Sequence, residues 1–323
     1  MPERVSVALC THNGQEHLAE QLRSVREQTR PVDEIVLSDD ASTDRTRALL
    51  EEFRANAPAG TRVIILHNEE PLGVTGNFEK AVRATTGDIV LLCDQDDVWA
   101  PGKVEALVGV LAEHGALLVH TDARIVDGAG EPTGDTLFGT LGVGERELGA
   151  EERGDGEKVL LRRNIVTGAT VALRRSLAEA AMPFPESWVH DEWLAMQAAL
   201  LGGLRVSRRT LTDYRIHGRN QIGASRLTAE SALGRLRAPR TARNARLLAR
   251  AQDLFDRFER EHPGDTARRA ELAAKLRHER VRSGYPAARL LRVPPVLREL
   301  ASGRYARYGG GMRDVLRDLV QPV

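Results

Sequence analysis

The residues with the clearest chemical potential are three carboxylates within four positions, Asp94-Gln95-Asp96-Asp97. They follow the apolar run Ile89–Cys93, which is typical of a strand buried on both faces of a parallel sheet. Carboxylates this close repel one another, so a fold tolerates them where something neutralises them. Ligands bind beyond the carboxyl ends of parallel strands. We therefore predict a hard divalent cation, Mg²⁺ or Mn²⁺, that carries anionic phosphates. The alternative, a solvated acidic turn, fits poorly with the bulky apolar Val98-Trp99 that follows.

Two other predicted strands also end in polar residues. Val5–Cys10 is followed by Thr11, and Glu34–Ser38 is followed by Asp39-Asp40. All three polar loops should then lie at one edge of the sheet, where a carboxylate can accept a hydrogen bond from a pyrimidine N–H. Turn and capping roles are the alternatives for Asp39 and Asp40, and a helix cap is the alternative for Thr11. No glycine-rich dinucleotide or P-loop motif follows the first strand, which weighs against a dehydrogenase or a P-loop enzyme.

The elements that must position these residues alternate along the chain. Further strands are expected at Arg62–Leu66 and Leu117–His120, and helices at 15–28, Asn77–Thr85 and 101–113. This order predicts an α/β fold of αβα layers around a parallel sheet with right-handed crossovers. Residues 123–160 are rich in glycine and acidic residues and show little pattern, so we interpret them as a long loop.

Charge is distributed unevenly over the 323 residues. Residues 1–225 contain 24 Lys and Arg against 35 Asp and Glu, whereas residues 226–323 contain 22 against 11. We expect a first domain over residues 1–225 and a basic helical region over residues 226–323, its segments separated by prolines that include Pro294-Pro295. A basic helical face is usually just solvated, but it also suits the anionic surface of a membrane.

Cysteine use and hydropathy suggest a compartment. Cys10 and Cys93 lie in predicted neighbouring strands, which fits free buried thiols in a reducing environment. No signal peptide is visible, and no apolar run approaches the roughly 20 residues of a membrane span. We therefore expect a cytoplasmic protein, at most peripheral to the inner face of the plasma membrane.

Three stretches together carry a resemblance to a known family: Val-Ala-Leu-Cys-Thr-His-Asn-Gly (7–14), Ser-Asp-Asp-Ala-Ser-Thr-Asp (38–44) and Cys-Asp-Gln-Asp-Asp-Val-Trp (93–99). The chain resembles the inverting family 2 glycosyltransferases of GT-A fold, in the rhamnosyltransferase-like branch, over residues 4–222. The resemblance implies that Thr11, Asp39 and Asp40 lie against the base and ribose of a nucleotide-sugar. It also implies that Asp94 and Asp96 match the Asp-x-Asp motif that holds a metal on the diphosphate. Asn77 or Asn68 is a further candidate for nucleotide contact, with an asparagine cap and a loop as the alternative.

The resemblance also covers the acceptor side. Asn164–Leu173 resembles the segment that lines this side, and we expect a strand interrupted at Thr167-Gly168, either by a ligand that approaches closely or by a neighbouring side chain above the glycine. Asp191 aligns with the catalytic carboxylate, and Glu192 is its rival; a first-turn helix acid is the alternative. Trp188 and Trp193 flank Asp191 and are candidates for a sugar platform.

The resemblance ends with the segment Leu211–Gln221. His217 is a candidate third metal ligand, with a structural histidine as the alternative, and Arg215 or Arg219 is a candidate phosphate contact.

The function implied is an inverting, metal-dependent transfer of a hexose from a nucleoside-diphosphate-sugar to a glycan or lipid-linked acceptor. The branch favours dTDP-rhamnose as donor and bacterial cell-surface polysaccharide assembly as the setting, with no nucleic acid partner. One alternative is a sugar nucleotidyltransferase, but the glycine-rich triphosphate loop expected after the first strand is missing at Thr11–Gly14. The other is a non-catalytic nucleotide-sugar-binding protein, which would not need a base at Asp191.

Overall fold

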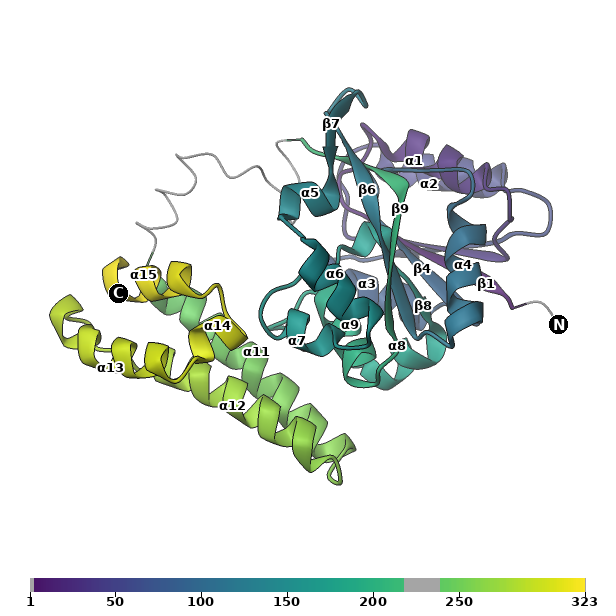
Figure 1. The fold of residues 1–323 in the computed structure, drawn as a ribbon. Coiled ribbons are helices and arrows are strands. Elements are labelled where there is room, and N and C mark those ends of the chain that lie inside the picture. The colour runs from purple at the N-terminus through teal and green to yellow at the C-terminus, as the bar shows by residue number, and fades with distance from the viewer. Residues whose placement is uncertain (1–2, 218–238, 323) are drawn as a thin grey trace. The chain divides into compact units, whose positions relative to one another are not determined.

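The computed structural model describes residues 3–217 and 239–322 and divides the chain into two units (Figure 1). The first, here the sheet unit, comprises Met1–Gly156 and Ile165–Ser225. The second, here the helical unit, comprises Glu157–Asn164 and Arg226–Val323. Among the described residues, no helix has the length and apolar content needed to cross a bilayer.

The described part of the sheet unit is built on nine strands in the order β3-β2-β1-β4-β8-β6-β9-β5, with β7 paired to β6. Their bounds are β1 Val5–Thr11, β2 Glu34–Asp39, β3 Arg62–His67, β4 Ile89–Cys93, β5 Val98–Trp99, β6 Leu118–Val126, β7 Pro132–Thr136, β8 Ala172–Arg174 and β9 Leu204–Arg215. Strands β3, β2, β1 and β4 pair in parallel, as predicted. The sheet beyond β4 is mixed, because β8 lies antiparallel between β4 and β6. The predicted parallel sheet is thus confirmed for its first four strands, and the sheet continues beyond them as a mixed one.

Helices cover the sheet, and α1, α2 and α4 contribute to one core with β1, β2 and β4. The helical elements before β9 are α1 Leu18–Arg26, α2 Thr46–Ala55, α3 Gly73–Arg83, α4 Lys103–His114, α5 Leu137–Leu141, α6 Glu145–Glu152, α7 Gly156–Leu160, the 3₁₀ turn η1 Gly168–Thr170, α8 Arg175–Ala181 and α9 His190–Leu200. Alternate strand residues such as Val7, Leu37 and Leu91 belong to this core. On the strands between them Ala8, Val36 and Val90 are also buried, so both faces are covered, as the continuous apolar runs predicted. Helix α3 packs against β1 and β2 and also contacts α9.

Residues 123–160 do not form the long loop that was predicted. They continue β6 to Val126 and then form β7, α5, α6 and α7. Strand β6 pairs in parallel with β9, whose residues lie more than 80 positions later in the sequence. Such a pairing leaves no local signal in the sequence, whereas the caps at Thr136 and Gly144 are local and begin α5 and α6.

Helix α3 begins four residues before its predicted start at Asn77. The carboxylate of Asp40 accepts hydrogen bonds from the N–H groups of Leu72 (2.7 Å) and Gly73 (2.9 Å). These donors at the beginning of the helix have no partner within it. A cap supplied by the residue directly after β2, over 30 residues away, therefore extends the helix, and periodicity alone misses it.

The segment 164–173 is a strand only at its end. Gly168–Thr170 forms the turn η1, and β8 begins at Ala172. Thr170 Oγ1 donates to the Thr167 carbonyl oxygen at 2.8 Å, and Gly168 N–H donates to Asp191 Oδ2 at 2.8 Å. These bonds turn the backbone away from the predicted extended conformation.

The helical unit confirms the expected helical C-terminal region. Its helices beyond residue 238 are α11 Arg240–Glu261, α12 Thr266–Ser283, α13 Arg289–Ala301, α14 Arg304–Tyr308 and α15 Met312–Val320. Pro294 and Pro295 lie inside α13 and do not separate segments, contrary to the prediction. Pro294 is exposed and Pro295 half-buried, so water can reach the carbonyl groups that lose an N–H partner.

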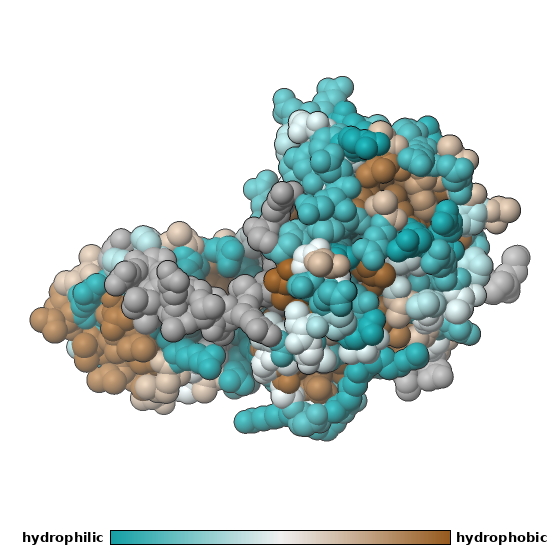
Figure 2. Space-filling model, turned by 90° about the horizontal axis from the view of Figure 1, so that it is seen from above, coloured by the Kyte–Doolittle hydropathy of each residue, from teal (hydrophilic) through white to brown (hydrophobic). Residues whose placement is uncertain are grey.

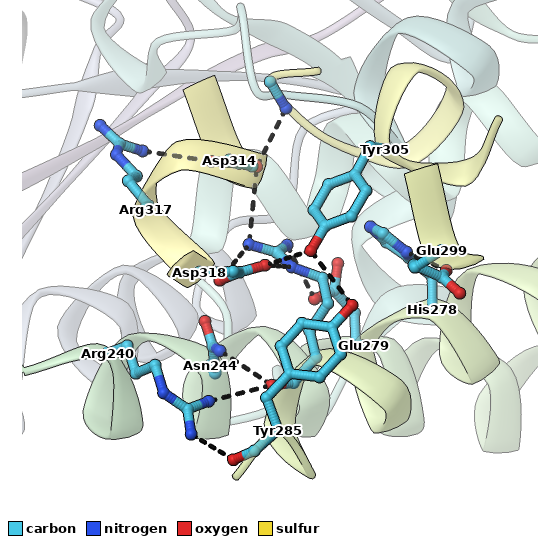
Figure 3. A network of polar contacts seen from close by, with 12 residues as sticks. Arg240, Asn244, His278, Glu279, Tyr285, Glu299, Tyr305, Asp314, Arg317 and Asp318 are labelled. Atoms are coloured by element: carbon cyan, nitrogen blue, oxygen red, sulfur yellow. Dashed lines mark hydrogen bonds and ion pairs between the residues drawn. The ribbon is translucent and has the colours of Figure 1, made fainter. Parts of the chain in front are cut away.

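A network of buried ion pairs ties these helices together (Figure 3). Arg282 on α12 donates to Asp318 on α15 at 2.7 Å and to Glu279 at 3.2 Å. The hydroxyl group of Tyr305 also donates to Asp318, at 2.8 Å. Arg282 and Asp318 are both about 1% exposed or less. Part of the arginine excess in this region is therefore used inside the unit.

Candidate functional site

The three polar loops predicted to share an edge do meet at the ends of β1, β2 and β4. Thr11 and Asp39 are register partners, and Thr11 Oγ1 donates to Asp39 Oδ1 at 3.0 Å. Gln95 joins β4 to β1, because its amide oxygen accepts from His12 N–H at 2.8 Å and its amide nitrogen donates to the His12 carbonyl oxygen at 3.1 Å. A Cβ at position 14 would lie 2.2 Å from Gln95 Oε1, so Gly14 makes this contact possible.

Asp39 and Asp40 have different surroundings. Burial opposes ionisation of Asp39, but hydrogen bonds from Ser42, Arg47 and Thr11 outweigh it and hold its pKa below the ordinary value. Asp40 instead binds Asn68 Nδ2 at 2.7 Å and the first N–H groups of α3. The capping role considered for this pair is thus observed for Asp40. A role of either carboxylate in nucleotide binding stays a prediction.

Asn77 is buried and engaged with β2. Its side-chain oxygen accepts from Ser38 Oγ at 2.7 Å and from Asn68 Nδ2 at 3.1 Å, and its Nδ2 donates to the Ser38 carbonyl oxygen at 2.9 Å. These bonds position α3 against the strand that ends in Asp39 and Asp40. The predicted contact of Asn77 with a nucleotide stays untested.

The carboxylates after β4 form a crowded cluster that is partly shielded from solvent. Asp94 and Asp96 are half-buried, and Asp97 is 1% exposed. Burial raises the pKa of Asp94 to about 7, the charges of Asp96 and Asp191 add to the rise, and Lys103 opposes it. Burial and the charges of Asp96 and Asp94 likewise raise the pKa of Asp97 well above its usual range. Asp97 Oδ1 accepts from Arg215 N–H at 3.0 Å, but its buried Oδ2 has no hydrogen-bond partner.

Two residues beside this cluster were not identified from the sequence. Lys103 is fully buried, binds the Ala169 carbonyl oxygen and Thr212 Oγ1, and lies over the Trp99 ring. Burial lowers its pKa to about 8. Tyr214 is also buried, and after burial itself the carboxylates that raise its pKa are those of Asp97, Asp94, Asp96 and Asp191. Nothing in the local sequence of a lysine at the start of a helix, or of a tyrosine in a strand, indicates such a position.

His217 lies next to Asp96, as its candidate role requires. Its Nε2 is 2.9 Å from Asp96 Oδ2, and its ring centroid is 5.2 Å from that of His17. Arg215 is 2% exposed, and it donates to the Asp96 carbonyl oxygen at 2.8 Å and to Glu20 at 2.7 Å. These contacts keep the Arg215 side chain buried next to the carboxylate cluster. Arg219, the other candidate phosphate contact, lies outside the described residues.

Asp191 lies in the first turn of α9, and its charge acts on Asp94, 97 positions earlier in the sequence. Its Oδ2 accepts from Gly168 N–H at 2.8 Å, and its Oδ1 accepts from Glu192 N–H at 2.7 Å. A Cβ at position 168 would lie 3.5 Å from Asp191 Oδ2 and 3.1 Å from His190 Nε2. Neighbouring side chains therefore leave little room for a side chain at position 168, which was one of the two interpretations considered for this glycine.

The aromatic residues around Asp191 belong to the core. Trp193 is fully buried and donates to the Ala181 carbonyl oxygen at 2.9 Å, and Trp188 is 6% exposed and packs edge-on against it. A sugar platform formed by Trp193 is thus excluded, and that hypothesis was wrong. His190 stacks on Phe78 with ring centroids 3.9 Å apart, and burial lowers its pKa to about 3, so it is neutral beside Asp191.

The carboxylate cluster could contribute some, but not all, of the ligands of a cation. Among the described residues, no group of three or more His, Cys, Asp or Glu side chains is arranged to hold a metal alone. The unpartnered Asp97 Oδ2 and the mutual repulsion of Asp94, Asp96 and Asp97 nevertheless leave negative charge that a cation would offset. A site with few protein ligands, completed by phosphate oxygens, is the usual arrangement for Mg²⁺.

Comparison with known sequences gives several relatives. An uncharacterized glycosyltransferase of Nostoc sp. is 28% identical over 235 residues, which are 70% of this chain and 69% of that protein. The dTDP-rhamnosyl transferase RfbG of Shigella flexneri is 32% identical over 112 residues, 33% of this chain and 38% of that protein. WfgD of Escherichia coli, a UDP-Glc:alpha-D-GlcNAc-diphosphoundecaprenol beta-1,3-glucosyltransferase, is 25% identical over 123 residues, 38% of this chain and 47% of that protein.

Solved structures share the fold. The mannosyltransferase PcManGT of Pyrobaculum calidifontis, solved with GDP-Man and Mn²⁺, aligns with a TM-score of 0.55 at 21% identity, over 95% of this chain and 76% of that one. Residues 1–349 of S. aureus TarS, solved with UDP-GlcNAc, align with a TM-score of 0.56 at 18% identity, over 97% and 89%. At these identities the likeness shows the fold alone, and it confirms the predicted GT-A-like α/β domain.

The family assignment rests on the region that contains β1 to β4 and the carboxylate cluster. The pattern that defines glycosyl transferase family 2 matches residues 6–179 of this chain, which is more than half of its 323 residues. The match begins within β1 and includes Thr11, Asp39 and Asp94, the residues that the fold brings to one edge. This chain therefore belongs to glycosyl transferase family 2.

Proposed function

We propose that the sheet unit transfers a hexose from a nucleoside-diphosphate-sugar to an acceptor hydroxyl group with inversion. One observation carries this proposal: Asp191, in the first turn of α9, lies close enough to the carboxylates after β4 for its charge to raise the pKa of Asp94, although the two segments are far apart in the sequence. In a family 2 glycosyltransferase, such a cluster supplies both the negative charge that holds a cation and a base for the acceptor.

In this mechanism the ends of β1 and β2 receive the nucleotide, with Thr11 and Asp39 against its base and ribose. A divalent cation, Mn²⁺ or Mg²⁺, held by Asp94 and Asp96 with His217 nearby, would neutralise the charge of the leaving diphosphate. Asp191 accepts the proton of the acceptor hydroxyl while the new C–O bond forms and the bond to the diphosphate breaks. The N–H groups of Gly168 and Glu192 hold the Asp191 carboxylate in orientation for this step.

The relatives support a setting in bacterial cell-surface polysaccharide assembly. The name of WfgD describes transfer to a diphosphoundecaprenol-linked sugar, and that of RfbG a dTDP-rhamnosyl transfer. We propose a lipid-linked or free glycan as acceptor and dTDP-rhamnose as the first donor to test, with the enzyme in the cytoplasm at the inner face of the plasma membrane.

A donor-hydrolysis assay tests this function. The full chain is incubated with a panel of nucleotide-sugars and Mn²⁺ or Mg²⁺, and release of nucleoside diphosphate is measured. We expect release from one donor, at a rate that drops to background with EDTA and in Asp96→Ala. Undiminished rates in both would overturn the metal's role. Formation of pyrophosphate and sugar phosphate would instead indicate a nucleotidyltransferase, and a rise in melting temperature without turnover would indicate a binding protein.

A further inference from the structure

Helices α13 and α15 expose an unusual amount of hydrophobic surface. The side chains concerned, here the apolar face, are Leu290 (86% exposed), Leu291 (64%), Val293, Leu297, Met312 (66%), Leu316 and Val320. Elsewhere in the described residues, only Leu72 and Leu201 are large hydrophobic side chains exposed to this extent. Figure 2 shows brown, hydrophobic surface gathered over the C-terminal helices. A hydrophobic patch of this kind marks an interaction site more often than a solvated surface.

The apolar face is separate from the side of each helix that packs into the unit. On α13, Leu290, Val293 and Leu297 follow one another at helical spacing, and the opposite side carries the buried Arg292, Val296 and Glu299. On α15, Met312, Leu316 and Val320 share one side, and Asp314 and Asp318 are buried on another. A surface helix needs one apolar side for its own core. Here the packed side combines the ion pairs with a small hydrophobic cluster that includes Val296 and Val315, and a second apolar side faces outward.

The charges around the apolar face have one sign. Within residues 284–322, all of which the structure describes, the acidic residues are Glu299, Asp314 and Asp318, and all three are buried. Glu299 pairs with Arg304, Asp314 with Arg243, and Asp318 with Arg282. Figure 3 shows Asp314 and Asp318 within the network. The exposed charged side chains of α13 and α15 are Arg289, Arg298 and Arg313. The outer surface of these helices therefore offers hydrophobic groups and positive charge, without an exposed carboxylate.

We infer that the apolar face docks on a lipid bilayer with anionic headgroups. A bilayer supplies both partners at once, an apolar interior for the leucines and phosphate groups for the arginines. A second copy of the chain that met this face with its own would bring arginines against arginines, which disfavours a symmetric dimer. The orientation of α13 and α15 would be in the plane of the surface, with the buried ion pairs holding the two helices together underneath.

The inference is independent of the proposed sugar transfer, and it replaces the sequence-based reason for a membrane contact. That reason was the overall excess of arginine after residue 226. The structure shows that Arg240, Arg282 and Arg292 are buried and bind groups within the helical unit, so they are not available to lipid. The apolar face instead provides specific contact residues, and a basic region alone would not need them.

Vesicle co-sedimentation of the full chain, without nucleotide or metal, tests the inference. We expect binding to vesicles of phosphatidylcholine with one-third phosphatidylglycerol, and weaker binding to phosphatidylcholine alone. The double variant Leu290→Gln, Leu297→Gln should lower the partition coefficient at least about tenfold, because two leucine side chains would no longer be buried in the bilayer. Leu201→Gln, which changes an exposed leucine in the sheet unit, is the matched control and should bind like the parent.

A charge pair separates the electrostatic part. Arg298→Ala with Arg313→Ala should weaken binding to the anionic vesicles about fivefold per arginine and leave the weak binding to phosphatidylcholine unchanged. Arg246→Ala with Arg277→Ala removes two exposed arginines from α11 and α12 and should have little effect. Circular dichroism and donor hydrolysis check that the variants fold, and Leu316→Gln on α15 repeats the test on the second helix.

Two outcomes would overturn the inference. If the leucine variants bind vesicles as tightly as Leu201→Gln does, the apolar face does not enter the bilayer. If the parent chain does not bind vesicles but forms a dimer that the leucine variants disrupt, measured by light scattering, then a second copy occupies the face.

Discussion

Both units bury carboxylates, but the surroundings of these carboxylates shift their pKa values in opposite directions. At the edge of the sheet unit, Asp94 and Asp97 lie among other carboxylates, and burial together with this repulsion raises the pKa of both. In the helical unit, burial also acts on Glu279 and Asp314, but Lys275, Arg282 and Arg243 outweigh it and lower the pKa of these groups. The second arrangement is complete within the chain, whereas the first leaves negative charge and an unpartnered oxygen. An incomplete cluster of this kind, at the carboxyl ends of strands, is what a ligand site requires.

The largest expected effect concerns Asp191. Asp191→Asn keeps the size of the side chain but cannot accept a proton, so kcat should fall by about 10²- to 10⁴-fold. Donor binding, measured by thermal shift, should change little, because Asp191 is assigned to the acceptor. Glu192→Gln is the control at the neighbouring position and should retain most of the activity. A loss of donor affinity in Asp191→Asn would move this residue to a binding role, and full activity would leave Glu192 as the base.

Asp318 offers the matched change in the helical unit. Asp318→Asn leaves the buried guanidinium group of Arg282 with one fewer countercharge and weakens the bond from Tyr305, so the unfolding free energy of this unit should fall by about 3–5 kcal/mol. Thermal unfolding followed by circular dichroism measures this loss. Asp256→Asn is the control, since the single bond from Gln252 can be accepted by Asn as well. A change below about 1 kcal/mol in Asp318→Asn would show that the network contributes little to stability.

The buried carboxylates of the two units should contribute to stability with opposite pH dependence. Lowered pKa values of Glu279, Glu299 and Asp314 mean that stability from these groups is lost as pH falls below the ordinary carboxyl range. Burial also lowers the pKa of His278, so the unfolded chain gains its proton first, and the loss begins below about pH 6.5. The raised pKa of Asp94 has the reverse sign: its stabilisation is present at pH 4 and is lost as pH rises through about 7. Within the same sheet unit, the lowered pKa of His190 acts like that of His278 and opposes Asp94.

The Asp94 contribution can be measured in EDTA as the difference between the parent chain and Asp94→Asn, because the His190 contribution cancels in that comparison; we expect about 1–3 kcal/mol between pH 7.5 and pH 5. All three tryptophans, Trp99, Trp188 and Trp193, lie in the sheet unit, so their fluorescence reports on that unit. Three of the four tyrosines lie in the helical unit, and near-ultraviolet circular dichroism follows them. A tryptophan-detected pH dependence that is the same in Asp94→Asn and the parent chain would contradict the sign assigned to Asp94.

Sequence reasoning found the parts of the site that local patterns encode. The apolar runs of β1, β2 and β4, and the polar residues at their ends, specify both the strands and the edge that they share. What it missed depends on contacts between distant residues: the bond from Asp40 that begins α3, the position of Lys103 beside Asp94, and the burial of Trp193. In the helical unit, an arginine such as Arg282 and one such as Arg298 look alike in sequence, yet one is buried and the other exposed. Only the pairing in space distinguishes a structural charge from one available to a ligand.

The smallest expected effect, and the most direct test of the comparison, concerns Asp97. Asp97→Asn keeps an acceptor for the N–H of Arg215 and places an amide nitrogen where Oδ2 now lies without a partner. In EDTA at pH 7.5, the melting temperature of the sheet unit should stay the same or rise by about 1–4 °C, because one source of repulsion is removed. The pH dependence assigned to Asp94 should flatten, since Asp97 contributes to the same cluster of charge. The stabilisation by Mn²⁺ with nucleoside diphosphate should shrink, because the cluster attracts a cation less strongly. Tryptophan fluorescence measures all three, and a drop in melting temperature as large as that of Asp318→Asn would mean that Asp97 is a structural carboxylate like those of the helical unit.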